Sequence, residues 1–391
     1  MTVDDDDHRQ EEIQQSLEEV KSENPRVRSA AVERLGKLRA GLSALQIATT
    51  DRNGYVRAAA AEALGQFPTE EVSLFLGDLL FDNNPFVRSA AIRSLGKVGA
   101  TDYVPHLIDA LDDSNPHIRA AALRALSELR APEATEVLVD ALRDPHRKIR
   151  LNAARGLRQL AVPESCAAME EVLRENLYQP RPDLPFLNTL IQAIAAAGTA
   201  EEVGPLLVKL MQEAVGCRTV AARAIRPFCY EPARPTLERA LTDRNPNLRL
   251  AALHALEEMG VERSLPAVRR LLEDEDNRVQ RAACRTLTRA GDEEVLPILR
   301  QMAFSPNPFL RPRAVEGLAS LDPEGSRNLL IELLHDNNIA VRTAAIDALA
   351  PHVDEPEVRA ALEQAREMEV TEQLRRQLEE VLVGRSAGGR F

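Results

Sequence analysis

The sequence contains no tryptophan, and aromatic residues make up only 3% of its 391 residues, although hydrophobic residues make up 44%. A core with so few aromatic rings has to be filled by Leu, Val, Ile and Ala. These residues suit close packing of helices better than a β-sandwich, because Ala and Leu favour helices and allow short distances between them. The composition therefore favours an all-α fold.

Cysteine is also scarce, and the four cysteines lie far apart without a C-x-x-C pair: Cys166, Cys217, Cys229 and Cys284. This spacing argues against a zinc site and against a disulfide framework, and is typical of a reduced cytosolic protein. The N-terminal residues MTVDDDDHRQ lack the basic and apolar parts of a secretory signal, and charged residues interrupt every apolar stretch. We therefore expect a cytoplasmic protein without a membrane partner.

Motifs for catalysis are missing as well. The sequence has no Gly-rich phosphate loop, no H-E-x-x-H and no G-x-S-x-G, and its seven histidines are scattered. A formal net charge of −12 argues against general affinity for nucleic acid, which needs an excess of Lys and Arg. We expect no catalytic residue, no metal and no cofactor.

A repeated segment is the strongest positive signal. NPFVRSAAIRSLGKVG (84–99) recurs as NPHIRAAALRALSELR (115–130) and NPNLRLAALHALEEMG (245–260). Alignment on the Arg after the apolar residue defines an anchor position in each unit: Arg28, Arg57, Arg88, Arg119, Arg150, Leu187, Arg218, Arg249, Gln280, Arg311 and Arg342. Eight of the ten intervals are 31 residues, and the other two are 29 and 37 residues, which identifies a repeat array.

Each unit carries signals for the start of a helix. Asn stands four residues before most anchors, and Pro often follows it, as in Asn84–Pro85. Asn is favoured at the N-cap and Pro at the first helical position. A second apolar-periodic segment follows in each unit, for example at 104–113. The pattern predicts an α-solenoid of about eleven two-helix repeats. Pro312, next to the anchor Arg311, is an exception that we expect to cost a helical hydrogen bond.

The motif D-x-N-P-x-V-R-x-A-A-x-x-A-L-G resembles the short HEAT-like repeats first grouped with phycobilisome lyases, and the resemblance covers roughly residues 10–368. The expected organisation has six parts: a disordered acidic tail (1–8), N-terminal HEAT-like repeats (9–174), a Pro-rich inserted loop (175–186), C-terminal HEAT-like repeats (187–368), a capping helix (369–384) and a flexible tail (385–391).

The resemblance also implies a structural role for the anchor arginines. Asp recurs six residues before most anchors, and in HEAT-like proteins this Asp and Arg form a ladder that ties neighbouring repeats together. For Arg119 the expected partner is Asp113. Arg suits the role because its planar fork bonds carboxylate and carbonyl oxygens at once.

Helical periodicity leaves one narrow exposed strip on each anchor helix, at positions −2, +1, +5 and +8 from the anchor. The resemblance places this strip in the concave groove. At +5 the central repeats carry basic residues, while both ends carry Glu33, Glu62, Glu316 and Asp347. The candidate binding residues are Arg93, Arg124, Arg155, Arg158, Arg223, Arg226, His254, Arg285, Tyr55 and Phe86.

The sequence thus predicts a non-catalytic, monomeric scaffold or adaptor that binds a protein partner, through an acidic segment or anionic ligand, in its concave groove. Two alternatives remain open. The resemblance suggests a bilin lyase or chaperone acting on phycobiliproteins, in which the arginines meet the propionates of an open-chain tetrapyrrole. More remote is a nucleic-acid-binding HEAT-like protein, which the acidic total and the missing tryptophan disfavour.

Overall fold

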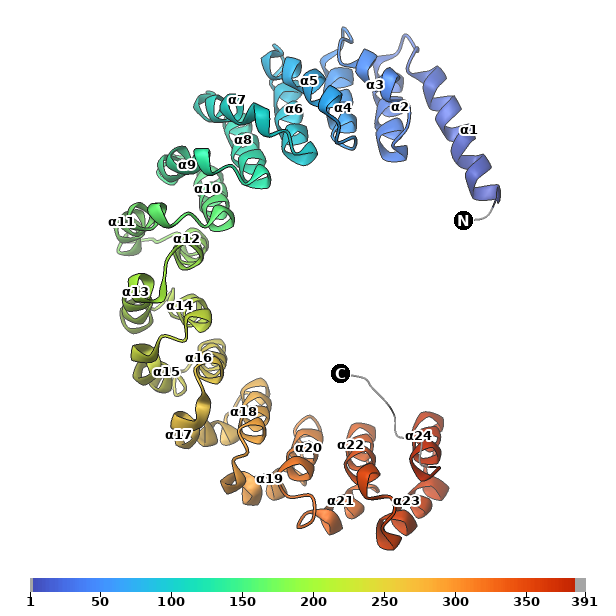
Figure 1. The fold of residues 1–391 in the computed structure, drawn as a ribbon, viewed down its shortest axis with the longest axis vertical. Coiled ribbons are helices and arrows are strands. Elements are labelled where there is room, and N and C mark those ends of the chain that lie inside the picture. The colour runs from blue at the N-terminus through green and yellow to red at the C-terminus, as the bar shows by residue number, and fades with distance from the viewer. Residues whose placement is uncertain (1–2, 384–391) are drawn as a thin grey trace. The chain divides into compact units, whose positions relative to one another are not determined.

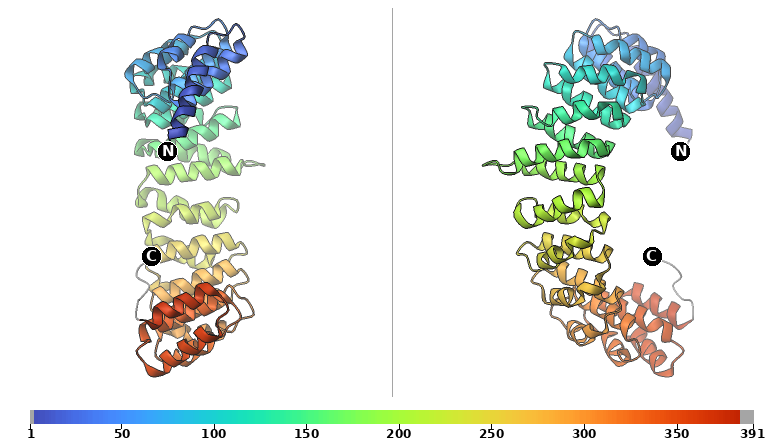
Figure 2. Two further views of the ribbon diagram at one scale, coloured as in Figure 1. Left: turned by 90° about the vertical axis from the view of Figure 1, so that its right-hand side faces the viewer. Right: turned by 60° about the vertical axis from the view of Figure 1, so that its left-hand side comes forward.

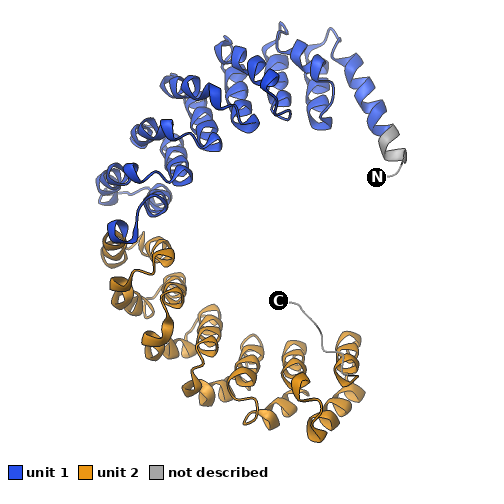
Figure 3. Ribbon diagram, in the orientation of Figure 1, with its two compact units in different colours: residues 1–203 blue, residues 204–391 orange. Residues whose placement is uncertain are grey.

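The computed structural model describes residues 3–383, and every regular element in that range is a helix (Figure 1). The chain divides into two compact units, Met1–Val203 and Gly204–Phe391 (Figure 3). The boundary falls inside helix α13 (Ala200–Glu213). Within each unit the helices form two layers, with anchor helices on the inner side of the curve and the alternating helices on the outer side (Figure 1).

The inner helices of unit 1 are α2 (Pro25–Leu38), α4 (Gly54–Leu64), α6 (Pro85–Val98), α8 (Pro116–Leu129), α10 (Arg147–Leu160) and α12 (Leu184–Ala197). The helices that accompany them are α1 (Val3–Glu19), α3 (Leu42–Ala48), α5 (Glu70–Asp78), α7 (Val104–Asp109), α9 (Thr135–Ala141) and α11 (Cys166–Leu177). Short 3₁₀ segments extend several outer helices. Each inner helix from α2 to α12 packs on the next, so the repeats stack side by side (Figure 2).

Unit 2 repeats the same alternation. Its inner helices are α14 (Arg218–Ala224), α16 (Pro246–Glu258), α18 (Asn277–Arg289), α20 (Arg311–Leu321), α22 (Ile339–Leu349) and α24 (Glu372–Leu382). Its outer helices are α13 (Ala200–Glu213), α15 (Arg234–Ala240), α17 (Leu265–Arg269), α19 (Leu296–Met302), α21 (Arg327–Leu333) and α23 (Pro356–Met368). The predicted all-α solenoid is therefore confirmed.

The N-cap signals act as predicted. The side-chain oxygen of Asn84 accepts a hydrogen bond of 2.9 Å from the backbone N–H of Phe86, and Pro85 occupies the first helical position. The carboxylate of Asp82 accepts the backbone N–H of Asn84 at 2.8 Å. These two bonds turn the loop into the helix without leaving its first donors unpaired.

The arginine ladder is also present, with a different pairing from the one predicted. The Nη1 of Arg119 donates to the backbone oxygen of Asp113 at 2.8 Å, but its carboxylate partner is Asp144 of the next repeat, 3.1 Å away. The carboxylate of Asp113 instead pairs with Arg88, at 3.2 Å. Most of these arginines thus hold their own loop and the following loop together, whereas Arg218 bonds the following loop alone among the described residues. The pairs are Arg28–Asp51, Arg57–Asp82, Arg88–Asp113, Arg119–Asp144, Arg150–Asp183, Arg218–Asp243, Arg249–Asp274, Arg311–Asp336 and Arg342–Glu369.

Repeats that lack the ladder arginine also lack the carboxylate that would pair with it. Where the anchor is Leu187 or Gln280, the position 25 residues later is Gln212 or Ser305 instead of an aspartate. A half-buried carboxylate without its cation would destabilise the folded state, so a repeat without the arginine is expected to have no aspartate either. Gln280 bonds the backbone oxygen of Leu272 at 3.1 Å instead.

Two expected boundaries need correction. Residues 3–8 belong to α1 and not to a disordered tail, since acidic residues are favoured at a helix N-terminus. The expected 175–186 loop shrinks to 178–183, because α11 and α12 extend into it from both sides. This short loop projects from unit 1 (Figure 2). The expected tail 385–391 lies outside the described residues, as do residues 1 and 2.

The expected capping helix, α24, has the local geometry of an anchor helix. Arg375 donates to the backbone oxygen of Glu369, six residues earlier, and the carboxylate of Glu369 accepts the backbone N–H of Thr371 at 2.8 Å. Both contacts match those of the preceding anchors. Helix α24 is therefore built as the inner helix of a further unit, which the sequence alignment missed because the interval is 33 residues.

Pro312 costs no helical hydrogen bond. Helix α20 begins at Arg311, whereas the corresponding helix α6 begins three residues before its anchor. Pro312 therefore stands in the first turn, where backbone N–H groups have no helical acceptor.

The last ladder pair predicts a pH dependence of stability. Burial alone would raise the pKa of Glu369, but hydrogen bonds from Arg342 and from Thr371 outweigh it and lower the pKa to about 2. The unfolded-state value is about 4.3. This stabilisation, on the order of 3 kcal/mol, is present above the unfolded pKa and is lost as the pH falls toward 2.

Urea unfolding of the parent and of Glu369→Gln at several pH values measures this term. The difference in unfolding free energy between the two proteins should shrink steadily between about pH 4.5 and pH 2. A difference that stays constant over that range would show that Glu369 has an ordinary pKa.

Candidate partner-binding surface

The predicted exposed strip lies on four neighbouring inner helices of unit 1, α4, α6, α8 and α10 (Figure 1). Equivalent positions on these helices form three rows, which together we call the inner strip. Its members are Tyr55, Phe86, His117 and Lys148 at −2, Ala58, Ser89, Ala120 and Leu151 at +1, and Glu62, Arg93, Arg124 and Arg155 at +5.

Two arginines of the +5 row have free guanidinium groups. Arg124 and Arg155 are exposed, and within residues 3–383 neither makes an ion pair. Arg93 is different, because its guanidinium bonds the carboxylate of Glu62 at 2.5 Å and the hydroxyl of Ser89 at 2.7 Å. The +5 row therefore begins with a neutralised pair and continues with two unpaired cations.

The −2 row begins with two exposed aromatic rings. Tyr55 is 71% exposed and Phe86 is 65% exposed, as predicted. Apolar rings left this open on adjacent helices are candidate anchors for a partner, because covering them removes apolar surface from water. Next to them the predicted exposure of the +1 row is wrong at Ser89 and Ala120, which are small and buried between neighbouring helices.

The prediction for the +8 row is wrong in most of unit 1. A Cβ on Gly96 would lie 2.8 Å from the Cα of Ala125, so this position faces the next inner helix and not the solvent. Gly36 and Gly65 meet the following helix in the same way. Arg158 is the exposed exception at +8, and it donates to the side-chain oxygen of Gln192 at 2.5 Å.

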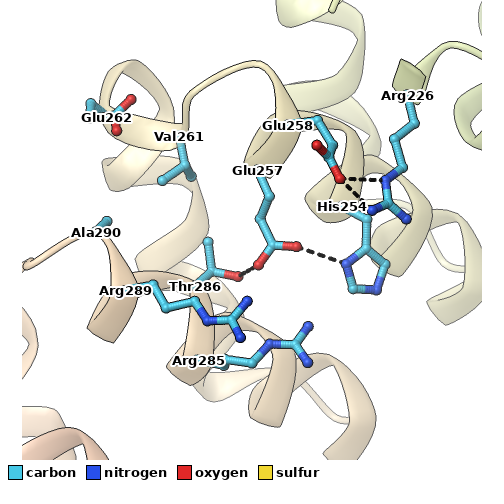
Figure 4. A pocket seen from close by; sticks show the side chains of 10 residues that line it. All are labelled: Arg226, His254, Glu257, Glu258, Val261, Glu262, Arg285, Thr286, Arg289 and Ala290. Atoms are coloured by element: carbon cyan, nitrogen blue, oxygen red, sulfur yellow. Dashed lines mark hydrogen bonds and ion pairs between the residues drawn. The ribbon is translucent and has the colours of Figure 1, made fainter. Parts of the chain in front are cut away.

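In unit 2 the predicted residues Arg226, His254 and Arg285 line a recess of about 530 Å³ (Figure 4). Arg285 and Arg289 point into it from α18, and within the described chain neither makes an ion pair. Arg226 pairs with Glu258, and His254 Nδ1 lies 2.8 Å from a carboxylate oxygen of Glu257. Arg223 is exposed on α14.

The carboxylate of Glu257 is fixed at one side of this recess. Burial favours its protonated form, but hydrogen bonds from His254 and from the hydroxyl of Thr286 prevail and hold its pKa below the usual value. The recess therefore contains fixed negative charge beside its arginines. The mixture makes it a weaker site for an anion than the inner strip of unit 1.

The structure thus separates residues that the sequence grouped together. Within the described residues, Arg124, Arg155, Arg223 and Arg285 make no ion pair, whereas Arg93, Arg158, Arg226 and His254 already have partners. Sequence reasoning missed Lys148, Arg289 and a set of outer-layer arginines. Two of these outer-layer arginines, Arg269 and Arg300, pair with Asp292 and Asp322. Because Arg269 and Arg300 are 31 residues apart, the repeat period could have identified them as equivalent positions.

No group of His, Cys, Asp or Glu side chains within the described residues has an arrangement suited to a metal ion. Over the same range, no helix is both long and apolar enough to cross a bilayer.

The geometry defines an α-solenoid of stacked two-helix units tied by an arginine ladder. The family model for HEAT repeats matches residues 41–117, 104–183, 233–311 and 301–383, which together exceed half of the chain. The chain belongs to the HEAT repeat family. No curated protein matches the sequence significantly.

Solved structures share the fold at low sequence identity. The karyopherin Kap121p, bound to the extreme C-terminus of the protein phosphatase Cdc14p, matches 96% of this chain and 49% of its own, with 14% identity and a TM-score of 0.59. Kap95p, studied with RanGDP, matches 95% of this chain and 55% of its own, with 16% identity and a TM-score of 0.52. An engineered protein matches 86% of this chain and 98% of its own, with 17% identity and a TM-score of 0.41. The chain thus spans about half the length of these karyopherins.

Proposed function

We propose that this protein is a non-catalytic scaffold that binds an acidic segment of a partner protein on the inner strip of unit 1. The observation that supports it is the pair of exposed, unpaired arginines, Arg124 and Arg155, at equivalent positions of adjacent helices. Elsewhere in unit 1, many arginines are used for ladder or surface ion pairs, such as Arg119 and Arg143. Two free cations side by side reinforce each other's potential in a protein whose net charge is −12.

The fold is compatible with this role. Stacked repeats present equivalent side chains at regular intervals along one continuous surface, which suits an extended macromolecular ligand better than a small substrate. A karyopherin of the same fold binds the C-terminal segment of another protein, which is an interaction of the proposed kind. The exposed rings of Tyr55 and Phe86 add apolar contact area next to the charges.

Poly-L-glutamate labelled with a fluorophore is a simple probe of this proposal. Reversal of both arginines, in Arg124→Glu/Arg155→Glu, should weaken binding at least about tenfold, because each lost charge-assisted bond is worth roughly 1.5–3 kcal/mol. Binding to the parent should also weaken between low and physiological salt, where the Debye length shortens to about 8 Å. Fluorescence anisotropy measures both effects.

A matched control distinguishes the effect of the inner-strip arginines on binding from the effect of net charge. Arg52 and Arg181 are exposed in loops of unit 1, so Arg52→Glu/Arg181→Glu makes the same change in net charge without altering a residue of the inner strip. This control should bind the probe nearly as well as the parent, and both variants should keep the parent's melting temperature. Equal binding by the parent and the inner-strip variant would contradict the proposal.

A further inference from the structure

The inner strip sets a length scale for its ligand. Arg93, Arg124 and Arg155 occupy the same position on α6, α8 and α10, which pack on one another in order. Axes of packed helices lie about 8–10 Å apart, so cationic side chains recur along the strip at about that interval.

The width of the inner strip, measured along each helix axis, follows from the geometry of the α-helix. The −2 and +5 rows are seven residues apart, which is nearly two turns, or about 10.5 Å along each helix axis. Between them lies the middle row, where Ser89 and Ala120 are small and buried. On α6 and α8 two rows of long side chains therefore flank short ones, and on α10 the middle position is the half-buried Leu151.

A helical ligand fits this cross-section poorly. An α-helix with its side chains is about 10–12 Å wide, so it would rest on the flanking rows without reaching the middle row. An extended chain is narrower and can lie between the rows, with its side chains directed to either one.

The repeat interval selects among extended conformations. A polyproline II helix has three residues per turn and rises about 3.1 Å per residue, so every third side chain returns to the same side after about 9 Å. A β-strand returns side chains to one side about every 6.6 Å, which does not match the interval between the helices. Only the three-residue period matches the spacing of the arginines.

We propose that the inner strip binds an extended, polyproline II-like segment of a partner, with acidic side chains at every third position and apolar residues between them. This inference rests on the proposed function and specifies its ligand. The acidic side chains meet Arg124 and Arg155 on α8 and α10, and apolar residues beyond the α8 end cover Phe86 and Tyr55 on α6 and α4. Glu62, already paired with Arg93, disfavours an acidic side chain beyond that end and sets the register.

Synthetic peptides test the spacing directly. Three labelled dodecamers, each of three glutamates and nine prolines, place the glutamates two, three or four positions apart. Proline keeps all three in the same conformation, so only the spacing differs. We expect the three-residue peptide to bind the full-length protein about tenfold more tightly than the other two, as measured by fluorescence anisotropy.

The inner-strip variant and a helical peptide complete the experiment. In Arg124→Glu/Arg155→Glu the preference for three-residue spacing should disappear, whereas Arg52→Glu/Arg181→Glu should retain it. Equal affinity for all three spacings, with binding still lost in the inner-strip variant, would overturn this inference and leave the proposed function standing. Tighter binding of an alanine-based helix with glutamate at every seventh position would also overturn it. Binding that is insensitive to the inner-strip variant would overturn both.

Discussion

Replacing Arg249 by alanine is expected to lower the free energy of unfolding by about 3–5 kcal/mol. The side chains of Arg249 and Asp274 are each only 6% exposed, and Nη2 of Arg249 lies 2.6 Å from the carboxylate of Asp274. The same guanidinium holds the backbone oxygen of Asp243 at 2.7 Å. The variant therefore leaves a buried carboxylate without its cation and frees one loop from the next. Urea unfolding followed by circular dichroism measures the loss.

A second substitution, at the partner aspartate, is expected to compensate for part of the stability lost at Arg249. Where the ladder is absent, Leu187 is followed 25 residues later by Gln212, so neither charge is present. Arg249→Leu/Asp274→Gln should therefore be more stable than Arg249→Leu alone, with a coupling of about 1–3 kcal/mol. Arg285→Ala, at an exposed site on the next inner helix, is the neutral control. Strictly additive effects of the two ladder substitutions would show that the pair contributes nothing as a pair.

Gly96→Ala is expected to destabilise the protein by about 1–3 kcal/mol, against the usual trend for this substitution. Within a helix, Ala is ordinarily favoured over Gly by about 1 kcal/mol. Here the new Cβ would lie 2.8 Å from the Cα and 3.0 Å from the Cβ of Ala125 on the next inner helix. Because one of these atoms is backbone, α6 and α8 would have to move apart. Thermal unfolding should show a lower melting temperature.

Lys97→Ala is the matched control, because it changes the next, exposed residue of the same helix. It should alter the unfolding free energy by no more than about 0.5 kcal/mol. If Gly96→Ala melted at a higher temperature than the parent, the close packing of α6 on α8 would be wrong.

Much of the architecture was readable from residues close together in the chain. The N-caps, the first-turn prolines and the apolar periodicity act within one turn or one helix, and the helices begin where these signals place them, as at Asn84 and Pro85. The exposure of Tyr55 and Phe86 followed from the same periodicity. The candidate binding residues were less predictable. Arg93 and Arg124 occupy equivalent positions, yet only Arg93 has a glutamate, Glu62, opposite it on the preceding helix.

Local sequence determined the helices and their caps, because those features depend on residues up to about four apart, whose geometry one helix dictates. The 31-residue period was read from the recurrence of the motif along the chain. The tertiary structure decided which carboxylate each arginine binds, which predicted cations remain free, and that the +8 glycines are contact points between helices. It also gave α24 the geometry of an anchor helix. The ion pairs and the contacts between helices join groups about 25–31 residues apart, such as Arg119 and Asp144, which meet only when one repeat packs on the next.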